Sequence, residues 1–238
     1  MLELFYSSSP NVYKVMIALE EMGLDYSPVF VDLSRGDQFD PARLGGAVTA
    51  KVPILRDHAP QDGGEPFTVI ESGAILQYLA EKTGRLLPVA PRARSAAMQW
   101  LFWQMANIGP MGGQYWHFHM YAPRLAPGVD LGYPQARYAK MLDACVDVME
   151  RRLAQAPYLA GDDYSIADIA CFPWLRYLKL GTPEDRPNVT RWREAIEARP
   201  AVAAAFARNL AIATPYGRNE RQGVAYPFEE LAKHTLVR

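Results

Sequence analysis

The sequence predicts an α/β unit with an open sheet over residues 1–84, followed by an all-helical region, so the fold class is α/β plus all-α. Two observations support this division. Strand and helix patterns alternate in the first part of the chain, in the order β-α-β-α-β-β-α. From Arg92 onward, apolar residues recur at helical spacing and no convincing strand pattern follows.

The first elements are expected to form a β-α-β unit. Residues 2–6 alternate like a short strand. Apolar residues between Val12 and Met22 fall at helical spacing, and Gly23 is suited to cap that helix. Residues 26–31 read as a second strand. A helical crossover between two strands of one sheet predicts a parallel pair.

Turn residues separate the remaining elements of this unit. In order, they are a short helix over 39–44, a strand over 52–55, a polar turn at Asp62-Gly63-Gly64, a strand over 67–70 and a helix over 72–82. Thr83-Gly84 closes the last helix, and residues 86–91 read as a linker.

The second region is expected to be a helical domain over residues 93–212. Its helices are predicted over 93–107, over 138–154, from a capping box at Ser165–Asp168, and over 194–198 and 202–212. Gly109-Pro110 should bend or end the first of these helices. Residues 213–238 mix glycine, proline and charge, and this C-terminal tail is left without an assigned element.

Charge and composition argue against several classes of function. The chain has 25 basic and 26 acidic side chains and a pI of about 6.4, so no electrostatic reason exists to expect nucleic acid or an anionic membrane. No apolar run approaches the ~18 residues of a membrane span, and the N-terminus lacks the basic region of a secretory signal. Cys145 and Cys171 belong to no Cys-x-x-Cys pair, and we expect them to be reduced and buried, as in a cytoplasmic protein.

Two short motifs indicate a cradle for an extended, peptide-like, acidic small molecule. Val52-Pro53 places a proline at the start of an apolar strand, where a cis turn would leave the Val52 backbone free. Glu71-Ser72 opens an apolar helix, whose N–H groups and dipole attract a carboxylate. Taken alone, Ser72 could be only an N-cap, and Pro53 could only mark an edge strand.

Several motifs, in order along the chain, carry a resemblance to a known family. They are Ser9-Pro10-Asn11, Gly36 to Phe39, Val52-Pro53, Asp62 to Pro66, Glu71 to Tyr78, Ala80 to Gly84, Gln99 to Gln104 and Ser165 to Asp168. With these motifs the chain resembles the cytosolic glutathione transferases over residues 1–210, and more narrowly the bacterial Nu-class enzymes that reduce disulfides with glutathione. The resemblance implies a thioredoxin-like N-terminal domain, an all-helical C-terminal domain and a cytoplasmic homodimer.

The resemblance also implies roles for individual residues. Ser9, where the family pattern has threonine, and Asn11 would polarise the sulfur of glutathione, with Ser7 and Ser8 as alternative hydroxyls. The implied glutathione-binding residues are Gln38 and Lys51 at the glycine end, Val52 and Pro53 at the cysteinyl part, Glu71 and Ser72 at the γ-glutamyl end, and Arg137 reaching a neighbouring subunit's glutathione. Glutathione would be a co-substrate, and no metal is implied.

The expected chemistry follows from a missing cysteine. A free thiol titrates near about 8.5 and reacts as the thiolate. A thioredoxin-type reductase needs Cys-x-x-Cys at the start of the first helix, and here the segment is Ser7-Ser8-Ser9-Pro10-Asn11. If the protein handles disulfides, both redox sulfurs must therefore come from glutathione. With the resemblance, this implies a glutathione-dependent disulfide-bond oxidoreductase acting on a small disulfide. The alternatives are a transferase that conjugates glutathione to electrophiles and a non-catalytic glutathione-transferase-like interaction protein.

Two other polar motifs read as structural. Tyr115 to His119 contains His-x-His, but no third ligand lies nearby in the sequence, so we expect packing or the lining of an apolar pocket rather than zinc. Ser165 and Asp168 read as a helix cap.

Overall fold

The computed structural model describes residues 1–176 and 184–213, with side chains described up to Asn209. These residues form two compact units. The first contains Met1–Arg85 and resumes at Ala198, whereas the second is Leu86–Glu197. The C-terminal helix, placed in the helical region by the sequence pattern, groups by its contacts with the first unit. Beyond residue 213, the expected tail lies outside the described residues.

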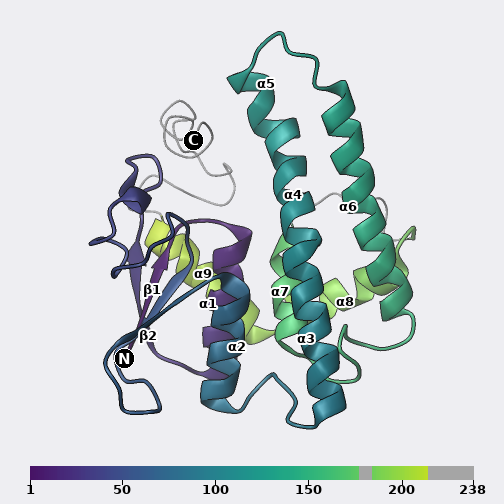
Figure 1. The fold of residues 1–238 in the computed structure, drawn as a ribbon. Coiled ribbons are helices and arrows are strands. Elements are labelled where there is room, and N and C mark those ends of the chain that lie inside the picture. The colour runs from purple at the N-terminus through teal and green to yellow at the C-terminus, as the bar shows by residue number, and fades with distance from the viewer. Residues whose placement is uncertain (177–183, 214–238) are drawn as a thin grey trace. The chain divides into compact units, whose positions relative to one another are not determined.

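The first unit is built on a four-stranded mixed sheet in the order β2-β1-β3-β4 (Figure 1). Its strands are β1 (Leu2–Tyr6), β2 (Tyr26–Phe30), β3 (Ile54–Asp57) and β4 (Phe67–Ile70). β1 and β2 are parallel, which confirms the prediction from the β-α-β pattern, and β3 is antiparallel to both of its neighbours. This arrangement is the thioredoxin-like fold that the resemblance implied.

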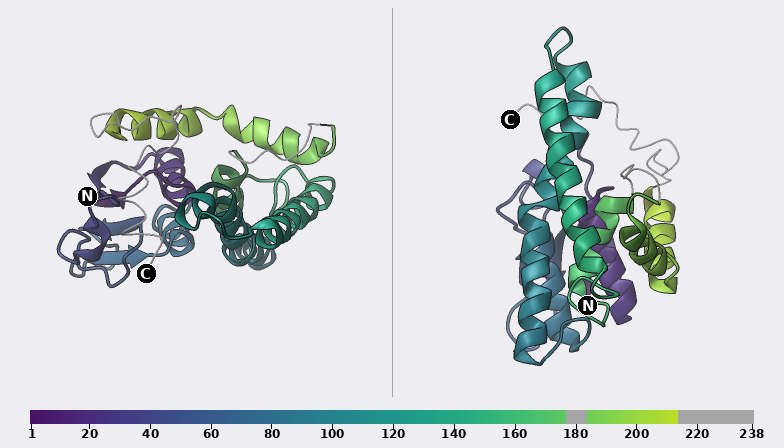
Figure 2. Two further views of the ribbon diagram at one scale, coloured as in Figure 1. Left: turned by 90° about the horizontal axis from the view of Figure 1, so that it is seen from above. Right: turned by 90° about the vertical axis from the view of Figure 1, so that its right-hand side faces the viewer.

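Three helices complete this unit. α1 (Pro10–Met22) and α2 (Ser72–Thr83) pack against each other, and α9 (Pro200–Ala213) packs on α1 (Figure 2). Every residue of α1 from Val12 to Leu19 is buried, because both α2 and α9 cover it. The helix that begins at the sulfur site predicted from the sequence is thus the central helix of its unit.

Ion pairs and ring contacts hold α9 in place. Arg199 Nε and Nη2 lie 2.5 and 2.9 Å from the two carboxylate oxygens of Glu21. Arg208 pairs with Glu20 at 3.3 Å, and its guanidinium lies 4.6 Å from the centre of the Tyr26 ring. Burial raises the pKa of the Tyr26 hydroxyl to about 12, although Arg208 opposes this shift.

Two expectations for the first unit are corrected by the structure. The helix expected over 39–44 is not formed; instead, a single 3-10 turn at Asp37–Phe39 leads into turns. Asp40 is extended, at φ −98° and ψ 104°, because the following Pro41 disfavours a helical backbone at the residue before it. The third strand begins at Ile54 rather than at Val52, because Pro53 has no N–H to offer to the strand ladder.

The second unit is helical throughout its described residues. It consists of α3 (Pro91–Ala106), α4 (Ile108–Trp116), a π-helical stretch (His117–Tyr121), α5 (Ala122–Leu125), α6 (Gly132–Leu153), α7 (Ile166–Arg176) and α8 (Pro187–Glu197). α4 and α6 lie side by side (Figure 1), and α3 packs on α7. None of the helices in the described part of the chain is both long and apolar enough to cross a membrane.

The predicted break near Gly109-Pro110 is confirmed, since α3 ends at Ala106 and α4 starts at Ile108. The glycines of α4 hid this helix from the sequence pattern. Packing requires one of these glycines, since a Cβ at Gly112 would lie 2.7 Å from Cε3 of the Trp174 ring. Close packing in the unit therefore outweighs the weak helix propensity of glycine.

The capping box at Ser165–Asp168 is confirmed and extends beyond its own helix. Asp168 Oδ2 accepts hydrogen bonds from the backbone N–H of Ser165 at 3.0 Å and from its hydroxyl at 3.1 Å. Asp168 Oδ1 accepts from the Leu159 N–H at 2.9 Å and from the Trp192 Nε1–H at 2.8 Å. Burial raises the pKa of this fully enclosed carboxyl, and the four donors oppose the shift. The carboxylate thus joins α7, the preceding loop and α8.

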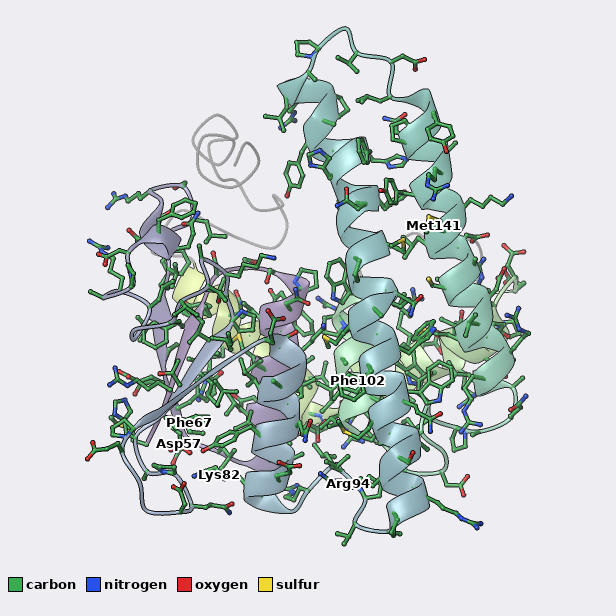
Figure 3. The ribbon with its side chains drawn as sticks, viewed as in Figure 1. Asp57, Phe67, Lys82, Arg94, Phe102 and Met141 are labelled. Atoms are coloured by element: carbon green, nitrogen blue, oxygen red, sulfur yellow. The ribbon has the colours of Figure 1, made fainter. Side chains whose placement is uncertain are left out.

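A second buried carboxylate links β3 to the end of α2. Asp57 is fully buried, and its carboxylate lies 2.7 Å from Lys82 Nζ and accepts from the Tyr78 hydroxyl at 2.7 Å and the Ala59 N–H at 2.9 Å (Figure 3). Burial alone would raise the pKa of Asp57, but Lys82, Ala59 and Tyr78 together bring it below its usual value.

Lys82→Met should lower the free energy of unfolding by about 2–3 kcal/mol at neutral pH, because it leaves the Asp57 carboxylate buried without its cation. Since the pKa of Asp57 is lowered on folding, its contribution to stability is complete above the unfolded-state pKa, at about 3.9, and is lost as the pH falls through the folded-state pKa. Urea denaturation measures both effects. Lys82→Met is compared with the wild type at neutral pH, and Asp57→Asn is compared with the wild type across this acidic range. Equal pH dependence in the two proteins would contradict it.

Candidate functional site

Three segments of the first unit meet at one end of the strands, where β1 and β4 finish and β3 begins. In the strand register, Phe5 of β1 lies opposite Ile54 of β3, and Ile54 lies opposite Ile70 of β4. The chain leaves β1 towards Ser7–Asn11, enters β3 from Val52-Pro53 and leaves β4 into Glu71-Ser72. The motifs singled out in the sequence are therefore brought together by the sheet.

The first turn of α1 holds the predicted sulfur-binding residues. Ser9 is the N-cap, with extended backbone at φ −159° and ψ 156°, and its Oγ accepts from the Val12 N–H at 3.3 Å. Pro10 follows at the first helical position, where no N–H is needed. Because the Ser9 oxygen serves as an acceptor in the cap, its hydroxyl proton is directed away from the helix and is available to a ligand.

Burial sets the Ser7 hydroxyl apart from those of Ser8 and Ser9. Ser7 is completely buried, whereas Ser8, Ser9 and Asn11 are half-buried. A bound molecule can reach a half-buried side chain more readily than a completely buried one. Of the alternatives left open by the sequence, the geometry favours Ser9 and Asn11 over Ser7.

The start of α2 has an unusual backbone. Glu71 is the N-cap, at φ 68° and ψ 120°, a region that a residue with a Cβ rarely adopts. Its side chain is exposed and makes no capping hydrogen bond, while its carbonyl accepts from the Ile75 N–H at 2.9 Å. Ser72 is therefore the first helical residue, which corrects the alternative reading of Ser72 as the cap. The exposed Glu71 carboxylate is thus not used to cap its own helix.

The sequence analysis missed Lys14, which the structure places against Ser72. Lys14 Nζ donates to Ser72 Oγ at 3.3 Å, and the two residues are only 1% and 6% exposed. The sequence does contain a signal for this contact, because Lys14 is surrounded by apolar residues of α1. A lysine inside a fully buried stretch of helix needs a polar partner.

Val52-Pro53 adopts the cis peptide bond anticipated from the sequence. Pro53 is buried and Val52 is half-buried. β3 is an interior strand, paired with both β1 and β4, so the reading of Pro53 as the mark of an edge strand is wrong. Val52 lies just before the paired residues of β3, at the end of the sheet where α1 and α2 also start.

The remaining predicted residues come from more distant segments. Gln38, in the 3-10 turn, is 3% exposed, and Lys51 is exposed just before Val52. Both belong to the first unit. Arg137 is an exposed residue of α6 in the helical unit.

The aromatic stretch Tyr115–His119 forms stacked pairs in the helical unit. The rings of Tyr115 and His119 are stacked with centroids 4.2 Å apart, and His119 Nδ1 lies 2.9 Å from the Tyr115 carbonyl oxygen. Phe118 stacks on Tyr138 of α6 at 5.4 Å. A packing role for this stretch agrees with these contacts.

Comparison with known sequences identifies both parts of the chain. Residues 8–82 match the glutathione S-transferase N-terminal domain, and residues 134–195 match the glutathione S-transferase C-terminal domain. The disulfide-bond oxidoreductase YfcG of Escherichia coli is 43% identical over 208 residues, which cover 87% of this chain and 94% of that protein. The disulfide-bond oxidoreductase YghU of the same organism is 36% identical over 216 residues, covering 84% and 72%.

Solved structures give the same result. A glutathione transferase of Burkholderia graminis with two glutathione molecules bound per subunit has a TM-score of 0.79 at 41% identity, with 86% of each chain covered. One from Pseudomonas putida with one glutathione disulfide bound per subunit has a TM-score of 0.76 at 36% identity, with 86% of this chain and 90% of that chain covered. The sheet, the helical unit and these relatives agree: the chain belongs to the glutathione transferase family.

Proposed function

We propose that this protein is a glutathione-dependent disulfide-bond oxidoreductase that takes both reacting thiols from bound glutathione. The first turn of α1 is the observation that supports this most directly. A serine N-cap and Asn11 stand where a thioredoxin-type reductase needs its cysteines. The names of YfcG and YghU, and the two glutathione molecules in the Burkholderia graminis structure, support the same function.

In this proposal the site holds glutathione at three places. Ser9 and Asn11 donate hydrogen bonds to the sulfur of the thiolate, aided by the N-terminal end of α1. A fall of one unit in the thiol pKa requires about 1.4 kcal/mol, which one or two such bonds can supply. The backbone of Val52, next to Pro53, forms hydrogen bonds with the cysteinyl residue of glutathione.

The two ends of glutathione bind to different segments. Glu71 and Ser72 hold the charged γ-glutamyl end at the start of α2. Gln38 and Lys51 meet the carboxylate of the glycine end. Each end carries a carboxylate, which suits a lysine or a helix N-terminus, and the γ-glutamyl end also carries an ammonium group, which suits Glu71.

The reaction is a pair of thiol–disulfide exchanges. The thiolate of a first glutathione attacks one sulfur of the small disulfide, which forms a mixed disulfide and releases one product thiolate. The thiolate of a second glutathione attacks the glutathione sulfur of the mixed disulfide and releases the other product thiolate. In sum, two glutathione molecules lose two electrons and two protons to the substrate, giving glutathione disulfide and two thiols.

The finer features of this proposal come from the resemblance. We assign the protein to the Nu class, acting as a cytoplasmic homodimer in which Arg137 reaches the glutathione of the neighbouring subunit. Sedimentation at micromolar concentration tests the dimer. An Arg137→Ala variant tests the contact between subunits, because it should weaken glutathione binding without dissociating the dimer.

The test of function compares two reactions under one set of conditions. With glutathione and a small disulfide such as hydroxyethyl disulfide, the protein should produce glutathione disulfide in proportion to its concentration. Conjugation of glutathione to an aryl halide should be slower. Family membership favours this second activity as the alternative, and turnover of the aryl halide alone would establish it instead.

The double variant Cys145→Ala/Cys171→Ala should keep most of the disulfide reductase activity. Both cysteines are buried helix residues of the second unit, and burial raises the pKa of the Cys145 thiol, so it is a poor thiolate. Loss of core packing should cost about 1 kcal/mol of stability per site. Circular dichroism establishes folding. A folded double variant without reductase activity would overturn the mechanism with two glutathione molecules.

A further inference from the structure

We propose that Lys14 is a positioning residue for glutathione: its buried ammonium group fixes the Ser72 hydroxyl as a donor to the carboxylate of the γ-glutamyl residue. This inference deepens the proposed function and rests on it. It assigns to a residue in the middle of α1 a part in recognising one end of the co-substrate.

The contact itself is enclosed. Lys14 and Ser72 come from two different helices, and the 3.3 Å hydrogen bond between Nζ and Oγ joins them in the interior of the unit. A lysine at 1% exposure has given up nearly all of its hydration, which is costly unless its charge is used. The residues of α1 on both sides of Lys14 are buried as well, from Val12 to Leu19, so the contact lies inside the packed part of the unit.

The direction of this hydrogen bond determines what Ser72 can do. An ammonium group has three donors and no acceptor, so the Ser72 oxygen must accept from Lys14. A hydroxyl has one proton to donate, and that proton points away from Lys14. A carboxylate bound at the start of α2 would accept it. Lys14 thus selects, between the two orientations of the serine, the one that recognises an anion.

The charge acts in the same direction as the hydrogen bond. The first N–H groups of α2 carry the positive end of the helix dipole, and Lys14 adds a full positive charge directly behind Ser72. The exposed carboxylate of Glu71 stands beside them and suits the amino group of the same γ-glutamyl residue. The segment therefore presents positive charge to the carboxylate of the γ-glutamyl residue and negative charge to its amino group.

The experiment compares two ligands, glutathione and 4-aminobutyryl-cysteinyl-glycine, which lacks the γ-glutamyl carboxylate. Titration calorimetry of Lys14→Met should show at least about tenfold weaker binding of glutathione and less than about threefold change for the analogue. Lys14→Arg should keep most of the preference for glutathione. In a Ser72→Ala background, Lys14→Met should add less than about threefold, since the lysine acts through the serine. Lys140→Met, an exposed lysine of α6, is the matched control and should bind like the wild type.

Equal weakening of both ligands by Lys14→Met, or no weakening of either, would overturn the role of Lys14. If the wild type fails to bind glutathione, the proposed function falls first, and the inference with it. If the wild type binds and Ser72→Ala weakens binding while Lys14→Met does not, only the inference fails. Should Lys14→Met not fold, the ¹⁵N resonance of the Lys14 ammonium in the wild type decides. It should move on addition of glutathione and not of the analogue, and any other result would overturn the inference.

Discussion

Asp168→Ala should lower the free energy of unfolding by about 3–5 kcal/mol, the largest effect on stability that we expect from a single substitution in this protein. The alanine leaves four buried donors without their acceptor, two from Ser165 and one each from Leu159 and Trp192. Each buried donor left unsatisfied costs about 1–3 kcal/mol, and the losses do not add fully because the donors share one site. Urea denaturation followed by tryptophan fluorescence measures the change.

Asp168→Asn is the sharper comparison. An amide keeps the size of the carboxylate but has only one oxygen, so it satisfies the pair of donors at one side and sets its NH2 group against the pair at the other. This variant should fall between wild type and alanine. Asp163→Ala, at an exposed position of the preceding loop, should change stability by no more than about 0.5 kcal/mol. An Asp168→Ala protein as stable as Asp163→Ala would show that the network contributes little.

Ser72→Ala and Glu71→Ala should each weaken glutathione binding about 10- to 100-fold. In the proposed complex both side chains bond to charged groups of the γ-glutamyl residue, and such bonds are worth about 1.5–3 kcal/mol. Glu71→Ala should not alter folding greatly, because Glu71 makes no cap bond. Ser72→Ala removes the hydroxyl that accepts from buried Lys14, so circular dichroism must establish its folding before the titration. Calorimetric titration with glutathione is the measurement.

Glu65→Ala is the control for the loss of a carboxylate in the same unit. Glu65 is exposed in the turn before β4, and its removal should leave glutathione affinity within about twofold of wild type. Unchanged affinity in both Ser72→Ala and Glu71→Ala would mean that the γ-glutamyl end binds elsewhere.

The parts of the fold that could be predicted are those specified by local signals. Gly23 caps α1 in the left-handed conformation, and the box at Ser165–Asp168 starts α7, because caps depend on residues only a few positions apart. The helix over 39–44 was wrong because Asp40 is extended in front of Pro41, which interrupts the segment near its start. α4 was missed because its glycines weaken the helical pattern, and the packing of the Trp174 ring on Gly112, which accounts for one of them, cannot be read from the sequence.

The same contrast holds for the candidate site. Val52-Pro53 and Glu71-Ser72 are short motifs whose meaning is nearly local, and the cis bond and the strained N-cap bear them out as structural features. Their roles towards glutathione stay predictions. Lys14 could not be placed, because its partner lies in another helix and only the packing of α2 on α1 brings the two together.

The packing of α9 on α1 has a consequence for the order of events during synthesis. The rings of Phe206 and Tyr13 contact each other at an angle of 32°, with centroids 4.3 Å apart, and Asn209 Nδ2 lies 3.5 Å from the Met16 sulfur. The unit that contains the candidate site therefore consists of an early part of the chain and a late one, with the whole helical unit translated between them. Since synthesis proceeds at about 5–20 residues per second, α1 is made many seconds before α9. Until then, the apolar surface of α1 that packs on α9 is exposed. Of the two units, the one whose synthesis begins earlier is thus completed later.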